Sequence, residues 1–322
     1  MLTKGLKNMA TIKKTAHKNK GLLVVVIPAY NEAMSIHETI VNLKKIKTKI
    51  NKLGLQYRIF VVNDGSSDDT SEIAQKAGAD HVVEHKLNRG LGAAVRTGLD
   101  AARRVGAQIA VKFDADLQHD PNDIPELIRP ILDDTADVVY GKRFDKITYK
   151  MPFMRKMGNR VFTRIMRFLT KWPLEDSQPG IFAVHNDYLE VFNLPGDYNY
   201  TQQVLLDSYH KGMRFAHVSV SFNKRYTGSS FITLKYPFIV LYQILMVLIS
   251  VKPMKIFATL GFFILFLGAI LFGTELARYF MELSDKPVVH VNLVLGLSFF
   301  GVQCLFFGLL AELIVRMNIR RN

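Results

Sequence analysis

The stretch Val111-Lys112-Phe113-Asp114-Ala115-Asp116-Leu117-Gln118-His119-Asp120 places two carboxylates and an amide just after an apolar run that begins at Ile109. Side chains two residues apart lie on one face of an extended chain, so Asp114, Asp116 and Gln118 would converge if the strand continued into its loop. Their oxygen atoms suit hard cations such as Mg²⁺ or Mn²⁺. We therefore predict a divalent cation site here, of the kind that bridges phosphate oxygens. An acidic loop that is merely solvated is the alternative.

The composition points to an anionic partner. The chain has 322 residues, with 42 Lys and Arg against 28 Asp and Glu, a net charge of +14. Because apolar runs fill the last quarter of the sequence, this excess favours a membrane surface over nucleic acid. The single cysteine, Cys304, has no partner for an intrachain disulfide, which fits a reducing compartment.

Residues 1–20 form a basic tail with six lysines and no acidic residue. The tail lacks an apolar segment of signal-peptide length, so we do not interpret it as a secretion signal. It is either a solvated arm or a segment weakly attracted to anionic lipid. A second methionine, Met9, is an alternative start.

Apolar runs and helical patterns alternate along the next two hundred residues. The runs expected to be strands are 22–27, 57–62, 81–83, 109–111 and 215–222, and helices are expected from residue 36, from about residue 71, and over 93–105 and 200–212. This alternation predicts a parallel α/β sheet, whose ligands bind beyond the carboxyl ends of the strands.

Polar loops follow three of these strands. They are Tyr30-Asn31-Glu32, the turn that begins at Asn63-Asp64, and Asn88-Arg89-Gly90-Leu91-Gly92. Each alone is ordinary turn chemistry. A Gly-rich turn before a helix nevertheless presents backbone N–H groups and a positive dipole to phosphate, and Arg89 adds charge. Because all three would lie at one edge of one sheet, we predict a nucleotide site there.

These loops together carry a resemblance to a known family. The segments 28–32, 63–68, 88–92 and 114–119 have the order and spacing of inverting family 2 glycosyltransferases with a GT-A fold, a Rossmann-like, mostly parallel sheet. The similarity spans roughly residues 22–230. Within the family the chain most resembles dolichyl- and polyprenyl-phosphate hexose synthases, which make lipid-phosphate mannose or glucose.

The resemblance implies roles for individual residues. The residues implied for the nucleotide sugar are Pro28, Tyr30, Glu32, Asp64, Arg89, Gly90, Asp114 and Ala115. Asp114, Asp116 and Gln118 match the positions that hold Mg²⁺ or Mn²⁺, and Asp116 is expected to be catalytic.

The later loops resemble the acceptor side of the family's site. Asp176 and Gln178 belong to a loop near the sugar and acceptor, in a form nearer the glucose-type synthases, and Ser229 belongs to the closing loop. In that closing loop Arg225 is suited to gripping a phosphate, and we expect Arg143 to assist it.

The implied reaction is transfer of a hexose, from a donor of the UDP-glucose or GDP-mannose class, to polyprenyl or dolichyl phosphate. Gln203 departs from the pattern, because many relatives carry an acidic residue there. One rival is a membrane glycosyltransferase that acts on a hydroxyl acceptor. Processive enzymes of that kind carry a Gln-X-X-Arg-Trp signature, and the only tryptophan, Trp172, lies in another context. A second rival is a catalytically silent scaffold that binds nucleotide or lipid.

The segment before the predicted acceptor loop has the pattern of a basic amphipathic helix. Arginines and a lysine at positions 155, 156, 160, 164 and 167 alternate with apolar residues at helical spacing. The helix either packs its apolar face on the core or lies on a membrane.

The C-terminal region predicts a membrane anchor. Residues 236–251 form a run of 16 uncharged residues, short for a span and expected to lie along the interface. Runs of 19 and 21 uncharged residues, 256–274 and 291–311, are each long enough to cross the bilayer as helices of about 256–277 and 290–315. By the positive-inside rule, the flanking lysines and arginines place both ends of this helix pair on the cytoplasmic face, and with them the catalytic domain of residues 21–232. The sequence leaves open whether the protein forms a homo-oligomer.

Overall fold

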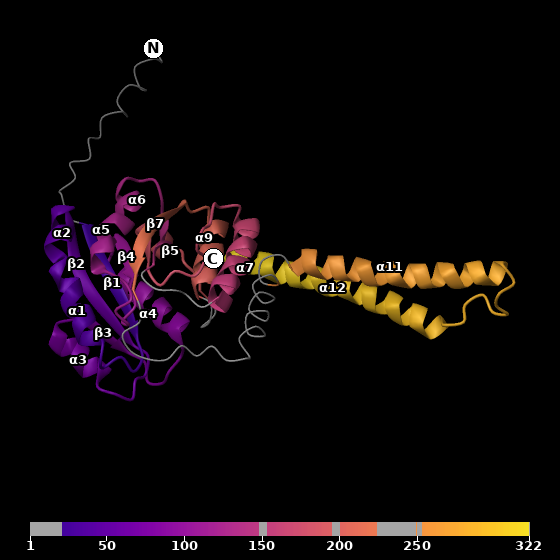
Figure 1. The fold of residues 1–322 in the computed structure, drawn as a ribbon, viewed down its shortest axis with the longest axis horizontal. Helices are drawn as coiled ribbons and strands as arrows, with labels where there is room; N and C mark the ends of the chain where they lie inside the picture. Colours follow the sequence, from indigo (N-terminus) through magenta and orange to yellow (C-terminus); the bar gives the residue numbers. More distant parts are fainter. Residues whose placement is uncertain (1–20, 148–152, 195–199, 224–248, 250–252, 322) are drawn as a thin grey trace, which may run out of the picture. The chain divides into compact units, whose positions relative to one another are not determined.

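The computed structural model describes residues 21–147, 153–194, 200–223, 249 and 253–321 (Figure 1). The chain divides into two compact units. The first unit comprises Met1–Tyr149, Pro179–Glu190 and Arg214–Thr227 and contains the sheet. The second comprises Lys150–Gln178, Val191–Met213 and Gly228–Asn322, and its described elements are helices.

The first unit is built on one seven-stranded sheet in the order β3-β2-β1-β4-β6-β5-β7. Its strands are β1 (Gly21–Ala29), β2 (Leu55–Asn63), β3 (His81–Glu84), β4 (Ile109–Lys112), β5 (Val138–Ile147), β6 (Phe182–His185) and β7 (Phe215–Phe222). Among the described strands, only β6 runs antiparallel to its neighbours, β4 and β5. The predicted GT-A-like, mostly parallel sheet is confirmed. The sequence analysis did not identify β6 or its reversed direction.

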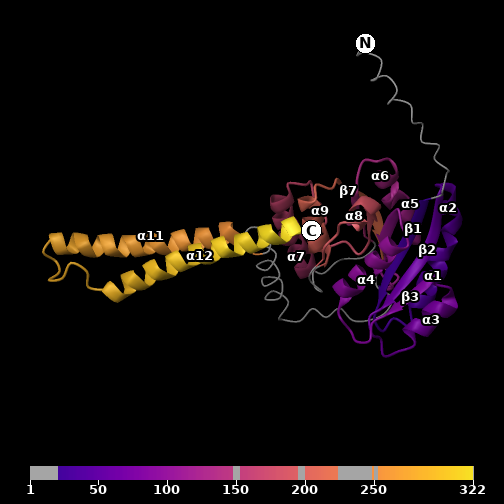
Figure 2. The ribbon, with the colours of Figure 1, turned by 180° about the vertical axis from the view of Figure 1, so that it is seen from behind.

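Helices cover both faces of this sheet (Figures 1 and 2). The helices α1 (Ile36–Lys45), α2 (Lys47–Lys52), α3 (Thr70–Ala77), α5 (Ile124–Leu127) and α6 (Arg129–Leu132) contribute apolar side chains to one core cluster with the alternate β1 residues Leu23, Val25 and Ile27. On the other face α4 (Leu91–Arg104) lies so close to β1 that a Cβ at Gly98 would overlap Val26, and α8 (Asn186–Leu189) packs beside α4.

This topology gathers loops that are distant in sequence at one edge. The carboxyl ends of β1, β2, β4, β5 and β7 point the same way, because these strands are parallel. Since β6 is reversed, its first residue pairs with the last residue of β4, Phe182 with Lys112. The loop that enters β6 therefore reaches the same edge as the loop that leaves β4.

The second unit contains α7 (Phe153–Thr170), α9 (Tyr200–His210) and two long apolar helices, α11 (Pro253–Phe280) and α12 (Val291–Arg321). Mean hydropathy reaches 2.5 in α11 and 2.2 in α12, and only 11% of each apolar window is buried. By length and composition both helices can cross a membrane, so they indicate a membrane protein. The predicted interfacial helix at 236–251 lies, apart from Ile249, outside the described residues.

The two apolar helices form a close pair. A Cβ at Gly261 of α11 would lie 2.8 Å from the carbonyl oxygen of Gly301 in α12, so glycine is required where the backbones meet. At the turn between the helices the Glu275 carboxylate accepts from the backbone N–H of His290 at 3.1 Å. Farther along α12, Arg316 Nε donates to Glu312 Oε1 at 3.1 Å, a contact that their four-residue spacing on one helix permits.

Candidate active site

The predicted cation ligands lie in a loop and not, as expected, on one face of an extended strand. Strand β4 ends at Lys112, before either carboxylate. The chain then turns so tightly that Leu117 takes the left-handed conformation, with φ of 60°, which is sterically unfavourable for a leucine. The turn is closed by Asp116 Oδ1, which accepts from the backbone N–H of Gln118 at 3.1 Å.

The loop is attached to β7 through the predicted amide ligand. Gln118 Nε2 donates to the carbonyl oxygen of Asn223 at 3.1 Å, and the backbone N–H of Asn223 donates to the carbonyl oxygen of Gln118 at 2.8 Å. Because Nε2 is held by the protein, the orientation of the amide is fixed and its Oε1 points the opposite way. From the other side, Thr39 Oγ1 donates to the carbonyl oxygen of Ala115 at 2.9 Å.

Gly180, in the loop that enters β6, packs directly against the carboxylate. A Cβ there would lie 2.6 Å from Asp114 Oδ2 and would overlap His119 Nε2. Lys112 is fully buried beneath the same carboxylate, where its ammonium pairs with Asp114 Oδ1 and donates to the carbonyl oxygen of Gly180 at 2.7 Å. The Asp114 side chain itself is 25% exposed, so the carboxylate stands between the buried ammonium and the open edge of the sheet.

His119 and Arg143 complete this part of the site. Burial lowers the pKa of His119 to about 4, so its ring is neutral at pH 7, and its Nε2 lies 3.8 Å from Asp114 Oδ2. The ring centroid of His119 lies 5.1 Å from that of Phe222, and the Arg143 guanidinium lies 5.3 Å from the same Phe222 ring. Arg143, which is buried, is therefore next to the predicted cation loop.

The loops after β1 and β2 are joined into one surface. The backbone N–H of Asn31 donates to Ser66 Oγ at 2.9 Å, and Asn31 Oδ1 accepts from the N–H of Ser67 at 2.9 Å. The next residue, Glu32, donates its N–H to Thr70 Oγ1 at 2.9 Å. Asn31 has φ of 53°, a conformation that asparagine tolerates better than most residues. Of the other predicted residues here, Pro28 is buried and Tyr30 is 48% exposed.

Asp64 holds the Gly-rich loop from inside the protein. Its side chain is 4% exposed, and its carboxylate accepts from the N–H groups of Arg89 at 3.0 Å and Gly90 at 2.8 Å. The same carboxylate contacts His85 Nδ1 at 2.6 Å. The structure thus differs from our expectation at one point, since the N–H groups of Arg89 and Gly90 face Asp64 rather than the solvent side. A direct role of Asp64 in nucleotide binding stays a prediction.

The remaining predicted residues belong to the second unit or lie outside the described residues. Asp176 and Gln178 belong to the second unit, where Asp176 is fully buried and its Oδ1 accepts from the N–H of Gln178 at 3.0 Å. Arg225 and Ser229 lie outside the described residues. Their parts at the acceptor stay predictions.

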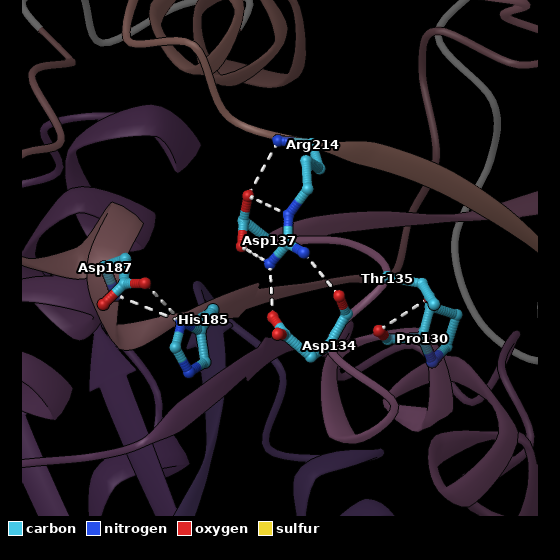
Figure 3. Close-up of polar contacts among 7 residues, drawn as sticks. All are labelled: Pro130, Asp134, Thr135, Asp137, His185, Asp187 and Arg214. Carbon is cyan, nitrogen blue, oxygen red and sulfur yellow. Dashed lines mark hydrogen bonds and ion pairs between the residues drawn. The ribbon is translucent and has the colours of Figure 1, made fainter. Parts of the chain in front are cut away.

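A second acidic cluster lies at the opposite edge of the sheet. Ligand atoms of Asp137, His185 and Asp187 lie within 4.8 Å of one another, a spacing that suits a metal ion (Figure 3). Both oxygens of Asp137 are, however, bound by Arg214, with Oδ1 2.7 Å from Nη2 and Oδ2 2.8 Å from the backbone N–H. Arg214 also reaches Asp134 Oδ1 at 2.6 Å. We therefore interpret the Asp137–Arg214 ion pair as a structural link between the residues that immediately precede β5 and β7.

From the Asp137–Arg214 ion pair we can predict how the stability of the fold depends on pH. The hydrogen bond from Arg214 holds the pKa of Asp137 below its ordinary value of 3.8. A carboxylate with a lowered pKa stabilises the fold above its unfolded pKa, and this contribution is lost as the pH falls through the folded value. We expect Arg214→Met to lower the Tm at pH 7 and to change it progressively less as the pH is brought below 3.8, measured by thermal melting of the detergent-solubilised protein.

The matched control is Arg129→Met. Arg129 Nη2 pairs with Glu126 Oε1 at 3.3 Å, but both side chains are more than 60% exposed, so its removal should hardly move the Tm. An Arg214→Met deficit of equal size at neutral and acidic pH would contradict the role given to Asp137.

The sequence analysis missed several residues that build the site. Thr39, Gly180 and His119 gave no separate signal, because each acts through a contact with a loop distant in sequence. Lys112 could have been noticed, because a lysine at the end of the apolar strand 109–112 needs a buried partner for its charge. The nearest acidic residue along the chain is Asp114.

The sequence matches the model of one protein family, Glycosyl transferase family 2, over residues 24–192, which is more than half of the chain. An uncharacterized protein of Methanocaldococcus jannaschii is 41% identical over 51% of this chain, and the match spans 65% of that relative, a little under two thirds of its length.

Two further relatives are named for their activities. A UDP-N-acetylglucosamine–dolichyl-phosphate N-acetylglucosaminyltransferase of Methanococcus voltae is 33% identical over 53% of this chain and 72% of its own. An undecaprenyl-phosphate 4-deoxy-4-formamido-L-arabinose transferase of Klebsiella pneumoniae is 28% identical over 91% of this chain and 88% of its own.

Among solved structures, the glucosyl-3-phosphoglycerate synthase of Mycobacterium tuberculosis, in complex with Mn²⁺, UDP and phosphoglyceric acid, superposes with a TM-score of 0.56. It is 22% identical, and the match covers 72% of this chain and 79% of that one. At this identity the likeness shows the fold alone.

Proposed function

The chain belongs to glycosyl transferase family 2, and on that premise we propose that it transfers a hexose from a nucleotide diphosphate sugar to a polyprenyl or dolichyl phosphate, with inversion at the anomeric carbon. One observation carries the proposal: a fixed loop with two carboxylates and an amide lies beside the buried Arg143. The relatives from Methanococcus and Klebsiella are both named for transfer involving a lipid phosphate, which supports the acceptor class.

The donor set fits a divalent cation. Asp114 contacts Lys112 through Oδ1, and Asp116 Oδ1 accepts from the N–H of Gln118, so the protein orients both carboxylates. The fixed amide of Gln118 supplies a third oxygen of the type that Mg²⁺ and Mn²⁺ prefer. We propose that these three residues would hold the cation, which would supply positive charge near the diphosphate when bound.

The neighbouring loops would bind the nucleotide. We assign this role to Tyr30, Glu32 and the joined turn after β2, because their cross-links give one preorganised surface at the carboxyl edge. Burial alone would raise the pKa of Asp68, but hydrogen bonds from Thr70 and Ala33 outweigh it and hold the pKa below the ordinary value. Asp68 thus stays ionised at neutral pH and holds the turn that carries this surface.

The second unit supports a reaction at a membrane. Helix α7 exposes Met157, Val161 and Phe168 along one stripe at helical spacing, with exposed arginines beside it. The ammonium of Lys255, in the first turn of the apolar helix α11, lies 4.9 Å from the ring centroid of Phe168. The stripe is therefore next to the start of a membrane-spanning helix. We propose that α7 contacts the cytoplasmic leaflet, and protease cleavage of the first unit in sealed vesicles of known orientation would test the side.

The test of the function is a panel assay. Full-length protein in detergent is incubated with Mn²⁺ or Mg²⁺ and with UDP-glucose, GDP-mannose or UDP-N-acetylglucosamine, each in turn with undecaprenyl or dolichyl phosphate. We expect one donor to give nucleoside diphosphate and a lipid-phosphate sugar, detected by mass spectrometry. Undecaprenol, which lacks the phosphate, is the matched control acceptor. Transfer to undecaprenol or to a sugar hydroxyl, without transfer to lipid phosphate, would contradict the proposal.

A further inference from the structure

Thr39 joins helix α1 to the loop that carries the candidate cation ligands. The residue is buried, with 1% of its surface exposed, and its Oγ1 donates to the carbonyl oxygen of Ala115 at 2.9 Å. In the sequence Ala115 separates Asp114 from Asp116. The hydroxyl of Thr39 therefore holds the backbone between the two predicted carboxylate ligands.

The start of α1 fixes the position of this hydroxyl. Ser35, the residue before the helix, donates its N–H to the carbonyl oxygen of Glu32 at 3.0 Å and its Oγ to the Glu32 carboxylate. One turn later, Thr39 Oγ1 lies 3.0 Å from the carbonyl oxygen of Ser35, which also accepts from the backbone N–H of Thr39 as in any helix. A threonine in a helix has few χ1 rotamers, and its hydroxyl has a single proton. Because the Ser35 carbonyl already has its helical donor, the proton is used best at Ala115.

Packing does not fill the space on this side of the loop. An open pocket of about 480 Å³ lies beside it, and Thr39, Phe113 and Leu117 are among its lining residues. Leu117 has φ of 60°, which is unfavourable for leucine, so the loop keeps its shape only where other contacts hold it. With open space beside the loop, an Ala115 carbonyl that lost its donor would be free to turn, and the two carboxylates would turn with it.

We propose that Thr39 is a positioning residue for the candidate cation site, because its hydroxyl fixes the backbone between Asp114 and Asp116 and so sets how the two carboxylates meet one ion. The inference rests on the proposed function for the identity of that ion. Thr39 acts through Ala115 and is not itself a ligand. Residues that orient metal ligands without touching the metal typically contribute about tenfold to a hundredfold to metal affinity.

The experiment compares three substitutions of Thr39. Thr39→Ala removes the hydroxyl without adding bulk, Thr39→Val replaces it by a methyl group, and Thr39→Ser keeps it. Mn²⁺ binding to the full-length protein in detergent is followed by electron paramagnetic resonance, and thermal melting shows which variants are folded. We expect Thr39→Ala and Thr39→Val to bind Mn²⁺ about tenfold or more weakly than the wild type. Thr39→Ser should bind it nearly as tightly as the wild type.

A second measurement separates positioning from a general loss of structure. The KM for Mn²⁺ in sugar transfer, at saturating donor and lipid phosphate, should rise in Thr39→Ala by the factor by which Mn²⁺ binding weakens. The kcat at saturating Mn²⁺ should stay within a few-fold of the wild-type value, because the ligands themselves are unchanged.

The matched control is Thr170→Ala. Thr170 is also 1% exposed, and its Oγ1 also donates to the carbonyl oxygen four residues earlier, Met166 O at 2.8 Å, but it lies in α7 of the second unit. This variant should lose stability for the same reason as Thr39→Ala and still bind Mn²⁺ as the wild type does.

A folded Thr39→Ala or Thr39→Val variant that binds Mn²⁺ as tightly as the wild type would overturn the inference. So would a Thr39→Ser variant that binds as weakly as Thr39→Ala, because the hydroxyl would then not be the group that matters. Wild-type protein that binds no Mn²⁺ would overturn the inference together with the cation site. Mn²⁺ binding that depends on Thr39, without transfer to any lipid phosphate, would remove the proposed function but leave the inference standing.

Discussion

Asp116→Asn is expected to lower kcat by about a thousandfold or more while the protein stays folded. Asp116 is 8% exposed and holds the turn through Oδ1, which accepts from the N–H of Gln118 at 3.1 Å. Asparagine can keep that acceptor, so the loop should retain its shape. The substitution removes the negative charge needed to hold a cation against the departing diphosphate. Initial rates with saturating donor and lipid phosphate give the effect, and thermal melting checks the fold.

Asp120→Asn is the control for this prediction. Asp120 lies in the same segment, and its Oδ1 likewise accepts from a backbone N–H two residues on, that of Asn122 at 2.9 Å. Since Asp120 is not a predicted ligand, the kcat of the Asp120→Asn variant should stay within a few-fold of the wild-type value. Full turnover of the wild type in excess chelator, with no divalent ion present, would refute the role of Asp116.

The sheet could be predicted from the sequence because the apolar run that identifies each strand lies within a few consecutive residues. Residues 23–29 of β1 and 59–62 of β2 are buried on both faces, so each appears as a continuous apolar run. β6 (Phe182–His185) was missed because its place and direction depend on antiparallel pairing with β4 and β5, which a local pattern does not show.

The site was predictable in its residues but not in its geometry. The carboxylates of the loop after β4 were identified, yet their arrangement depends on the left-handed Leu117 and on contacts with Thr39, Gly180 and Asn223. Each of these contacts joins segments far apart in the chain, which periodicity cannot reveal. Asp64 shows the same limit: its place after a strand was clear, but its two bonds to the Gly-rich loop were not.

The second large effect is expected at the acceptor phosphate. A hydroxyl acceptor must lose a proton to attack, and enzymes supply a carboxylate base for it. A phosphate monoester has a second pKa near 6 by analogy with phosphorylated side chains, so it is largely dianionic at neutral pH and needs no base. The protein must instead hold the acceptor phosphate beside the donor diphosphate against their repulsion, which is a task for arginines in a site of low dielectric constant.

Arg143 is placed for that task, with its guanidinium 5.3 Å from the Phe222 ring, which in turn neighbours His119 of the cation loop. We expect Arg143→Ala to lower kcat/KM for lipid phosphate by about a hundredfold or more, and Arg143→Lys to recover only part of the loss, because fork geometry matters as well as charge. Arg225, outside the described residues, should give the same pattern. Arg104→Ala, which removes an exposed arginine paired with Asp100 at 2.8 Å, is the control and should change little.

The same kinetics decide whether the enzyme uses a base. The candidate is Asp176, which is fully buried in the second unit. If phosphate is the nucleophile, no single carboxylate outside the cation and nucleotide loops is indispensable as a base. The rate should then rise toward about pH 6 to 7 and level off, as the acceptor loses its second proton. Arginine variants with an unchanged dependence on lipid phosphate would remove Arg143 and Arg225 from the acceptor site. A loss of several orders of magnitude in Asp176→Asn that is relieved by raising the pH would instead identify a general base, and with it a hydroxyl acceptor.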